Sequence, residues 1–393
     1  MKTKIGVFFG GRSVEHEISI ISALQAINAF DKDKYTITPV YITKKGLWYT
    51  GDVLFDMEKY KDIDSLLQQC EEVFMHPAYK DFNIYRKKNK LFGGKNIITS
   101  IDVAFPILHG TNGEDGIFQG LLELIGIPFV GCNTVSSANG MDKIYMKMIL
   151  KENQIPVIDY VWFTGKEWFL DKERIIKKIE KQLGYPLIIK PANLGSSVGI
   201  TAANDSDSLI QSVAIAEKFA ERIIVEKRVV NIKEINCSVL GDYAENSTSV
   251  CEEPLKSGEI LSYEDKYISK NKSSSKGMQS TKRRMPADLP SDMTEKIQHY
   301  ASETFRVLSC SGVSRIDFII DENDHTVYIN EINTIPGSLS FYLWEATNLS
   351  FKELMDKLVK IALKREREVE LKTYSYEQNI FNLKGGMKGG MKQ

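Results

Sequence analysis

Residues 4–30, KIGVFFGGRSVEHEISIISALQAINAF, determine how the chain begins to fold. The apolar run from Lys4 to Phe9 ends in two glycines, which is typical of a buried strand that stops at a turn. Beyond Glu15 the apolar residues recur at helical spacing, so we predict a strand, a loop and a helix. Glu15 falls in the loop, where α/β folds place ligands, although an acidic residue there also suits the first turn of a helix.

The alternation of strand and helix continues along the next hundred residues. The β-type runs YTITPVYI (35–42) and IDVAFPIL (101–108) are followed by an amphipathic stretch at 116–126. This order favours a parallel sheet, so we predict an N-terminal α/β domain over residues 1–138. Residues 71–99 are rich in lysine, asparagine and aromatic residues, and we expect a peripheral insertion with a β-hairpin tip.

Two further domains are expected after this point. Over residues 139–236 we predict a central domain in which PLIIKP, IIVEKRVV and EINCSVLG are strands of a mostly antiparallel sheet. Over residues 237–372 the strands SRIDFII and TVYINEIN indicate a third domain. Residues 267–286, rich in serine and lysine, are expected to form a mobile loop, and the Gly/Lys tail at 373–393 is expected to be disordered.

Composition narrows the class of function. The chain of 393 residues carries 51 basic and 52 acidic residues, so no net field favours nucleic acid or an anionic membrane, and small molecules are the expected partners. No apolar run approaches the roughly 18 residues that cross a bilayer, and the N-terminal run is too short for a signal peptide. We expect a cytoplasmic protein. Its five widely spaced cysteines favour reduced, structural thiols: Cys70, Cys132, Cys237, Cys251 and Cys310.

Polar side chains share a face on each of the two strands near the C-terminus. Residues two apart on a strand project together, so Arg315 pairs with Asp317 and Glu331 with Asn333. Two carboxylates and an amide oxygen are hard ligands suited to Mg²⁺ that also binds phosphate oxygens. A solvated strand face is the alternative reading of the same pattern.

Two other segments suggest a nucleotide site or are ordinary structural turns, and a third places a histidine at a strand end. Lys190 ends an apolar strand and is followed by the small-residue loop 195–199, whose backbone N–H groups can approach phosphates, although the order differs from a Walker loop. Glu226 and Lys227 interrupt a β run where an adenine could pair with backbone, or where a strand simply ends. His109 ends another apolar strand, and a structural role is equally expected for it.

Taken in order, seven segments resemble the D-alanine–D-alanine ligase family of the ATP-grasp superfamily, which includes D-Ala–D-Ser and D-Ala–D-lactate ligases. The resemblance covers nearly all of residues 4–360 and implies the α/β (α+β) ATP-grasp fold, in which an N-terminal parallel domain precedes two α+β domains that enclose the nucleotide. The segments are GGRSVEHEISIISA, HGTNGEDGIFQGLLELIGIPFVGC, MDK, IIKPANLGSSVG, YEDKYIS, SRIDF and NEINTIPG.

The resemblance also implies a role for each matching residue. The implied catalytic positions are Glu15, Ser196, Tyr267, Arg315 and Gly337. Those that bind amino-acid substrates are Glu15, His109, Arg315, Ser340, Tyr342 and Leu343. Those that bind ATP are Lys143, Lys190, Ser196, Ser197, Glu226, Lys227, Val229, Val230, Glu234 and Lys266. Two Mg²⁺ ions, with Mn²⁺ as an alternative ion, are expected on Asp317, Glu331 and Asn333.

Three features depart from the family pattern. Tyr342 stands where the family usually has a serine that holds the carboxylate of the second substrate, and Ser340 is close by. The segment 228–233, before Glu234, is one residue longer than usual. The loop after Tyr267 is long and basic, with Lys282, Arg283 and Arg284, and its cations either form a solvated insertion or contact phosphate or a substrate carboxylate.

The resemblance predicts ATP- and Mg²⁺-dependent ligation of two D-alanines through an acyl phosphate, for peptidoglycan precursor synthesis. A ligase that joins another second substrate, such as D-serine or D-lactate, is the alternative. A nucleotide-binding protein without ligase activity is a third hypothesis, and the intact set of Arg315, Asp317, Glu331 and Asn333 argues against it. The family resemblance also suggests a homodimer.

Overall fold

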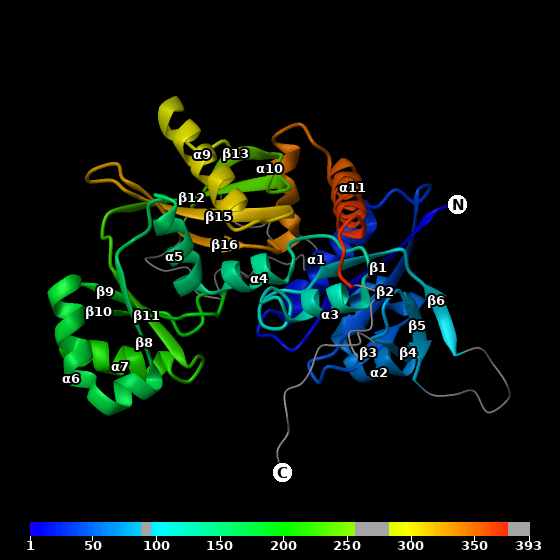
Figure 1. Ribbon diagram of the computed structural model, residues 1–393, viewed down its shortest axis with the longest axis horizontal. Coiled ribbons are helices and arrows are strands. Elements are labelled where there is room, and N and C mark those ends of the chain that lie inside the picture. The colour runs from blue at the N-terminus through cyan, green and yellow to red at the C-terminus, as the bar shows by residue number, and fades with distance from the viewer. Residues whose placement is uncertain (88–95, 256–282, 376–393) are drawn as a thin grey trace, which may run out of the picture.

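The computed structural model describes residues 1–87, 96–255 and 283–375. These residues form three β-sheets with helices packed against them, and the chain runs from one sheet to the next in order (Figure 1). The mixture of a partly parallel sheet with two antiparallel sheets confirms the predicted α/β (α+β) class.

The N-terminal sheet has seven strands in the order β6-β5-β4-β3-β2-β1-β7. Strand β1 (Thr3–Gly10) pairs in parallel with β2 (Tyr35–Ile42) and β7 (Val103–Ile107), and the helix α1 (His16–Ala29) makes the crossover from β1 to β2. Burial of β1 on both faces explains its unbroken apolar run. The parallel pairing predicted from the alternation of strand and helix is therefore confirmed for β2, β1 and β7.

Four short antiparallel strands extend this sheet beyond β2. The last three of them come from the segment expected to be a peripheral insertion and pair with the rest of the sheet, while residues 88–95 lie outside the described residues. The strands are β3 (Trp48–Thr50), β4 (Glu71–Met75), β5 (Asn83–Arg86) and β6 (Ile97–Ser100). The helices of this part are η1 (Asp52–Phe55), η2 (Met57–Lys61), α2 (Ile63–Gln68), α3 (Ile117–Ile125) and α4 (Thr134–Met141).

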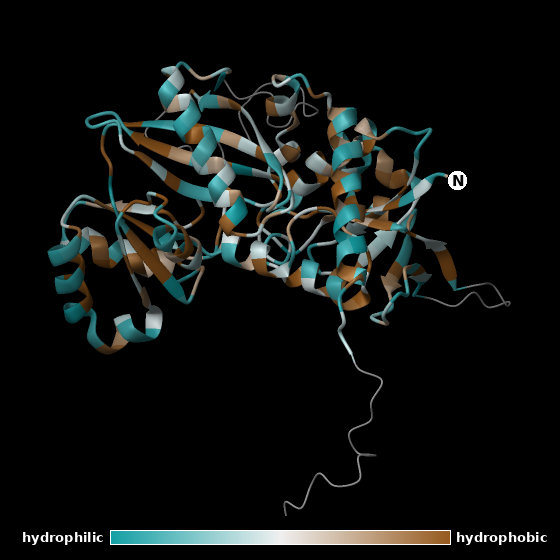
Figure 2. Cartoon of the chain, turned by 45° about the horizontal axis from the view of Figure 1, so that its top comes forward, coloured by the Kyte–Doolittle hydropathy of each residue, from teal (hydrophilic) through white to brown (hydrophobic). Residues whose placement is uncertain are grey.

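The second sheet is four-stranded and antiparallel, in the order β10-β9-β11-β8. Its strands are β8 (Tyr160–Thr164), β9 (Leu187–Pro191), β10 (Thr201–Ala203) and β11 (Arg222–Lys227). The helices α6 (Gly165–Gln182) and α7 (Ser206–Ala216) share an apolar core with it. Figure 2 shows that hydrophilic residues make up much of these two helices, whereas the strands that they cover are largely apolar.

The third sheet is five-stranded, in the order β14-β13-β12-β15-β16. Its strands are β12 (Ile232–Gly241), β13 (Asn246–Pro254), β14 (Arg283–Arg284), β15 (Gly312–Asp321) and β16 (Val327–Asn333). One face packs on α5 (Lys143–Glu152) and α9 (Ser291–Val307) in a common core. Along β15, Ile316, Phe318 and Ile320 enter this core, so Arg315 and Asp317 project from the opposite face.

The positions of one strand and one helix differ from the sequence prediction. The strand within EINCSVLG is β12, which pairs with β13 and β15, so placing it in one sheet with IIVEKRVV was wrong. Helix α5 also packs on the third sheet. Alternating apolar residues predict a strand but not its partner, and only four residues separate β11 from β12.

The C-terminal helix returns the chain to the N-terminal sheet. After η4 (Gly337–Ser340) and α10 (Phe341–Glu345), α11 (Phe351–Glu370) shares the apolar core of α1 and β1. The guanidinium of Arg365 donates to the carbonyl oxygens of Gly131 (2.6 Å) and Phe129 (2.5 Å) and lies 4.1 Å from the centre of the Phe129 ring. Residues 376–393 of the predicted tail lie outside the described residues.

Replacing Arg365 with alanine should lower the free energy of unfolding by about 2–4 kcal/mol, because two carbonyl oxygens lose a charged donor. Urea denaturation followed by circular dichroism measures the change. Arg367→Ala, on the exposed side of the same helix, is the matched control and should stay within about 0.5 kcal/mol of the parent chain. Equal effects of the two substitutions would contradict the role given to Arg365.

Candidate functional site

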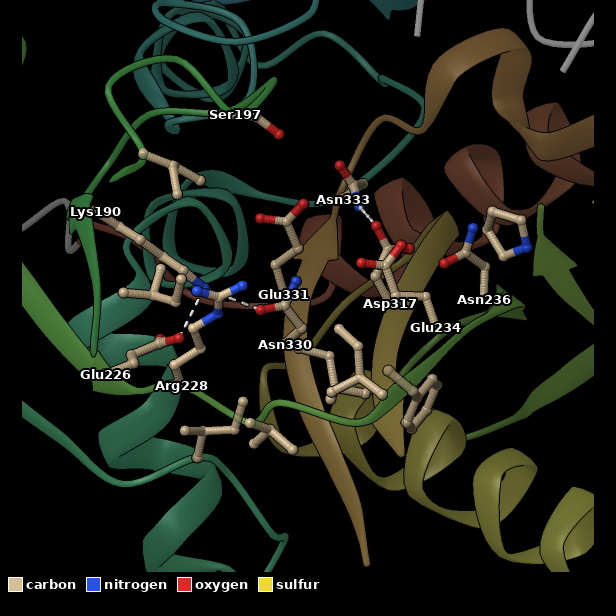
Figure 3. A pocket seen from close by; sticks show the side chains of 18 of the residues that line it. Lys190, Ser197, Glu226, Arg228, Glu234, Asn236, Asp317, Asn330, Glu331 and Asn333 are labelled. Carbon is tan, nitrogen blue, oxygen red and sulfur yellow. Dashed lines mark hydrogen bonds and ion pairs between the residues drawn. The ribbon is translucent and has the colours of Figure 1, made fainter. Parts of the chain in front are cut away.

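A cavity of about 500 Å³ lies where the second and third sheets face each other (Figure 3). It contains many of the residues singled out from the sequence: Glu15, Lys190, Ser196, Ser197, Glu226, Lys227, Val229, Val230, Glu234, Arg315, Asp317, Glu331 and Asn333. Other predicted site residues do not line it: His109, Lys143, Gly337, Ser340, Tyr342 and Leu343. Lys266 and Tyr267 lie outside the described residues.

Strands β15 and β16 form one wall of the cavity. Their register places Asp317 opposite Glu331 and Arg315 opposite Asn333. Arg315 donates to both carboxylate oxygens of Asp317, at 2.6 and 2.7 Å, and the side-chain amide of Asn333 donates to the same carboxylate at 3.1 Å. Burial alone would lower the pKa of Arg315. The charge of Asp317 and its hydrogen bonds outweigh this effect and raise the pKa of the guanidinium well above its usual value.

The opposite wall carries lysines. Lys190 on β9 contacts Glu226 of β11 at 2.7 Å and donates to the side-chain oxygen of Asn330 at 3.1 Å. Lys143, at the start of α5, lies 3.4 Å from Glu331 and donates to the carbonyl oxygen of Leu194 at 2.9 Å. The ammonium groups of Lys190 and Lys143 therefore lie beside Asn330 and Glu331 of β16, respectively.

Lys147 is a buried residue of this wall that the sequence reasoning missed. It is 0% exposed and lies 3.0 Å from the second oxygen of Glu226. Burial lowers the pKa of Lys147, and the charges of Lys147 and Lys190 outweigh the effect of burial on Glu226 and hold its pKa at about 2. Its spacing of four residues from Lys143 on one helix was the signal that could have indicated it.

The small-residue loop after β9 contacts the N-terminal sheet. Ser196 and Ser197 adopt left-handed backbone, with φ of 53° and 59°. The hydroxyl of Ser196 donates to the carboxylate of Glu15, and a Cβ atom at Gly195 would lie 3.1 Å from the same carboxylate. Glycine at 195 therefore permits this close approach.

His109 and Glu114 lie behind the loop that carries Glu15. His109 shares a 3.0 Å hydrogen bond with the Ser22 hydroxyl, and burial lowers its pKa to about 4. The carboxyl group of Glu114, which sequence reasoning missed, accepts from the backbone N–H groups of Gly110 (2.8 Å) and Ile335 (3.0 Å). Burial and the nearby charge of Glu15 raise the pKa of Glu114 to about 8.

The segment after β16 turns sharply. Ser338, Leu339 and Ser340 are three successive residues with positive φ, at 52°, 53° and 49°. The backbone N–H of Ser338 donates to the Ser22 hydroxyl at 2.9 Å, so this turn and His109 contact the same side chain. Ser340 and Leu343 are fully buried rather than on the cavity wall.

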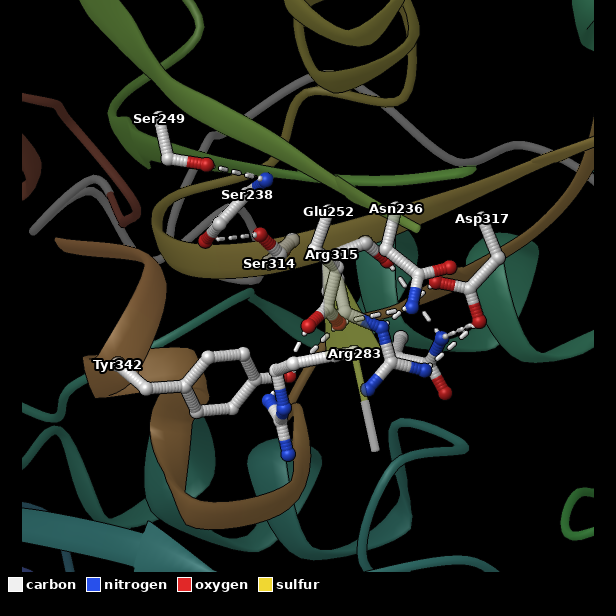
Figure 4. Close-up of polar contacts among 10 residues, drawn as sticks. Asn236, Ser238, Ser249, Glu252, Arg283, Ser314, Arg315, Asp317 and Tyr342 are labelled. Atoms are coloured by element: carbon white, nitrogen blue, oxygen red, sulfur yellow. Dashed lines mark hydrogen bonds and ion pairs between the residues drawn. The ribbon is translucent and has the colours of Figure 1, made fainter. Parts of the chain in front are cut away.

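Tyr342 belongs to a buried polar cluster (Figure 4). Its hydroxyl donates to Glu252 at 3.0 Å, and the side-chain amide of Asn236 donates to the same oxygen at 2.9 Å. Arg283 donates to the other oxygen of Glu252 at 3.1 Å. Burial and the charge of Glu252 raise the pKa of Tyr342. Glu252 and Asn236 were not singled out from the sequence, because their strands carry no motif.

The linker from β11 to β12 also lines the cavity. Lys227, Val229 and Val230 lie along it, and Glu234 follows on β12. The ammonium group of Lys227 donates to the carbonyl oxygen of Tyr185 at 3.1 Å, while Val230 is 71% exposed. An extended linker with apolar side chains suits a flat aromatic base.

The residues present fit a divalent cation that shares its ligands with phosphate. Within residues 1–87, 96–255 and 283–375, no cluster of three or more His, Cys, Asp or Glu side chains could hold a metal ion alone. Asp317, Glu331 and the amide of Asn333 nonetheless lie together. Because Mg²⁺ is usually held by one or two carboxylates, waters and substrate phosphates, this set is sufficient.

The buried His109 should make stability depend on pH. Between about pH 6.5 and pH 4 the unfolded chain binds a proton that the folded chain does not, so the free energy of unfolding should fall on acidification, by at most about 3 kcal/mol. Urea denaturation at pH 7 and pH 4.5 should show a smaller difference for His109→Gln than for the parent chain. His299→Gln, at an exposed position on α9, is the control. An unchanged difference in His109→Gln would contradict this assignment.

Comparison with known proteins agrees with this geometry. Residues 4–132 match the model of the D-ala D-ala ligase N-terminus and residues 149–360 that of the C-terminus. A D-alanine–D-alanine ligase from Thermosipho melanesiensis is 41% identical over 385 residues, which is 97% of this chain and 99% of the relative.

Solved structures of this family share the fold. A D-alanine–D-alanine ligase from Coxiella burnetii aligns with a TM-score of 0.76 at 30% identity, over 94% of this chain and 96% of that one. A D-Ala:D-Ser ligase from Enterococcus faecalis aligns with a TM-score of 0.78 at 32% identity, over 92% and 100%. In the described part of the chain, no helix is both long enough and apolar enough to span a membrane. The chain belongs to the D-alanine–D-alanine ligase family.

Proposed function

We propose that this enzyme joins two molecules of D-alanine into D-alanyl-D-alanine, with conversion of ATP to ADP and phosphate, for peptidoglycan precursor synthesis. The observation that carries the proposal is the Asp317 carboxylate held between the side chains of Arg315 and Asn333, in one cavity with Lys190. Carboxylates, an arginine and lysines around one space are the groups that phosphoryl transfer requires. Full-length similarity to D-alanine–D-alanine ligases supports the choice of substrate.

In the first step a carboxylate oxygen of the first D-alanine attacks the γ-phosphorus of ATP, the bond to the bridging oxygen breaks and ADP leaves. Glu15 binds the ammonium group of that D-alanine. Lys143 and Lys190 compensate phosphate charge, and the backbone of the 195–199 loop closes over the phosphates. Mg²⁺, when bound at Asp317, Glu331 and Asn333, supplies charge neutralisation for the transferred phosphoryl group.

In the second step the amine of the second D-alanine attacks the acyl carbon and loses a proton, and phosphate leaves. Arg315 and the backbone at Gly337 stabilise the oxyanion that develops on the acyl group. The residues thus act by positioning and by charge stabilisation, and no covalent bond to the protein is needed. Glu226, Lys227, Val229, Val230 and Glu234 hold the adenosine part of ATP.

The other hypotheses receive less support. A D-Ala:D-Ser ligase has the same fold, so the fold alone does not separate the two substrates, but the relative that is 41% identical is a D-alanine–D-alanine ligase. A nucleotide-binding protein without ligase activity would not need Arg315 beside two carboxylates. Two Mg²⁺ ions or Mn²⁺ in their place, a homodimer and a cytoplasmic location remain parts of the proposal.

The direct test is phosphate release with ATP, Mg²⁺ and single D- or L-amino acids, with the product identified by mass spectrometry. Release with D-alanine alone, accompanied by the dipeptide, is the expected result. Release only with a pair such as D-alanine and D-serine would transfer support to the alternative. ATP binding without release for any amino acid would favour the nucleotide-binding protein.

Arg315→Ala should abolish dipeptide formation, with a loss of at least about 100-fold in kcat, because the developing oxyanion loses its cation. ATP affinity should change little, since the proposed adenosine contacts lie on β11, on the linker and at the start of β12. Isothermal titration with ATP and steady-state kinetics measure the two quantities. Arg306→Ala, at an exposed position on α9, is the control. Normal turnover in Arg315→Ala would mean that the active site has been assigned wrongly.

A further inference from the structure

A row of polar side chains crosses the third sheet from β16 to β13. The register places Glu331 opposite Asp317, Asp317 opposite Asn236, and Asn236 opposite Glu252. Directly opposed residues on neighbouring strands project from the same face, and all four line the cavity. The row therefore extends the proposed metal-binding wall toward the edge strand β14.

Arg283, on β14, ends this row and is fixed from two sides. Its guanidinium lies 4.0 Å from the centre of the Tyr342 ring and donates to Glu252 at 3.1 Å. Glu252 is itself only 2% exposed and is held by Tyr342 and Asn236 through its other oxygen (Figure 4). Arg283 lines the cavity, so a rigidly oriented cation faces the substrate space.

The position of Arg283 separates it from the phosphate-binding groups. Lys143 and Lys190 contact residues of β16, at one edge of the sheet, whereas Arg283 lies on β14, at the other edge. Neighbouring strands lie about 4.8 Å apart, so Glu252 on β13 stands roughly 10 Å from Asp317 on β15. The phosphoryl group and the ligand of Arg283 therefore occupy different parts of the cavity.

We infer that Arg283 binds the carboxylate of the second amino acid, and that Tyr342 and Glu252 are positioning residues that orient its guanidinium. This inference rests on the proposed ligase function. A guanidinium offers parallel N–H donors that match a carboxylate, and the contacts with Glu252 and Tyr342 fix the orientation of this one at the cavity wall. The geometry accounts for tyrosine at the position where a serine was expected, since Tyr342 contributes through Arg283.

Competition between two acceptors tests the role of Arg283. The enzyme is supplied with ATP, Mg²⁺, D-alanine and D-alaninamide, which carries no carboxylate, and the ratio of acid to amide dipeptide is measured by mass spectrometry. Arg283→Ala should lower this ratio roughly 10- to 100-fold relative to the parent enzyme, because only the acid loses a charged contact. Arg284→Ala, whose side chain pairs with Glu253 and Asp288, should keep the parent ratio.

Two further variants separate this role from a purely structural one. Arg283→Lys keeps the charge but not the fork, so its ratio should lie between those of the parent and Arg283→Ala. Tyr342→Phe keeps the ring beneath Arg283 and removes only the bond to Glu252, so it should raise the KM for the second D-alanine several-fold with little change in kcat. Thermal unfolding midpoints identify any variant that fails to fold.

The outcomes distinguish the two proposals. Absence of both dipeptides with the parent enzyme would overturn the proposed formation of D-alanyl-D-alanine and this inference together. A normal parent enzyme with an unchanged product ratio in both Arg283→Ala and Arg283→Lys would overturn the inference alone. A fall in the ratio in Arg284→Ala as large as that in Arg283→Ala would also overturn it, since a general loss of surface charge would then explain the effect.

Discussion

The alternation along β15 is the constraint on which the site depends. Ile316, Phe318 and Ile320 pack into the core with α5 and α9, and this burial fixes the register of the strand. A slip of one residue would exchange its two faces and bury Arg315 and Asp317 in that apolar core. The apolar face therefore determines where the arginine and the carboxylate stand, and the paired strands β12 and β16 inherit the same orientation.

Charge balance is the second property that holds the site together. Buried or partly buried carboxylates pair with cations at or near the cavity: Glu226 with Lys147 and Lys190, Glu331 with Lys143, Asp317 with Arg315, and Glu252 with Arg283. Pairing in a low-dielectric site makes the geometry of each pair strict but adds little net stability, because desolvation opposes the attraction. The main effect of these pairs is therefore to orient the charged side chains, and bound ligands can take the place of some of the partners. Their contribution to the free energy of folding is small.

The features that the sequence predicted correctly are those that depend on a local pattern of residues. The strand and helix at residues 4–30 and the shared face of Arg315 and Asp317 follow from periodicity alone, which reports burial directly. The sheet membership of β12 could not be predicted, because alternation is the same whichever strand is the partner. Glu252 could not be predicted either, since its importance arises from residues 31 and 90 positions away that only the fold brings near.

The turn after β16 links the parts of the site that no local pattern connects. Three non-glycine residues in left-handed backbone cost roughly 1–3 kcal/mol each, so the turn persists only because its surroundings fix it. Ser22, which also contacts His109, accepts from the N–H of Ser338 on the N-terminal side. Beyond the turn, the Trp344 ring N–H donates to Ser238 at 3.0 Å, and Tyr342 reaches Glu252.

These contacts tie the turn to the first and third sheets at once. A shift of the N-terminal sheet relative to the third sheet would have to break the contact between Ser22 and Ser338 or move α10, which carries Tyr342. The strained turn therefore helps to fix the positions of Glu15 and His109 relative to Glu252 and Arg283. Substrate-binding groups from two separate sheets can act on neighbouring atoms only if such a rigid connection exists between them.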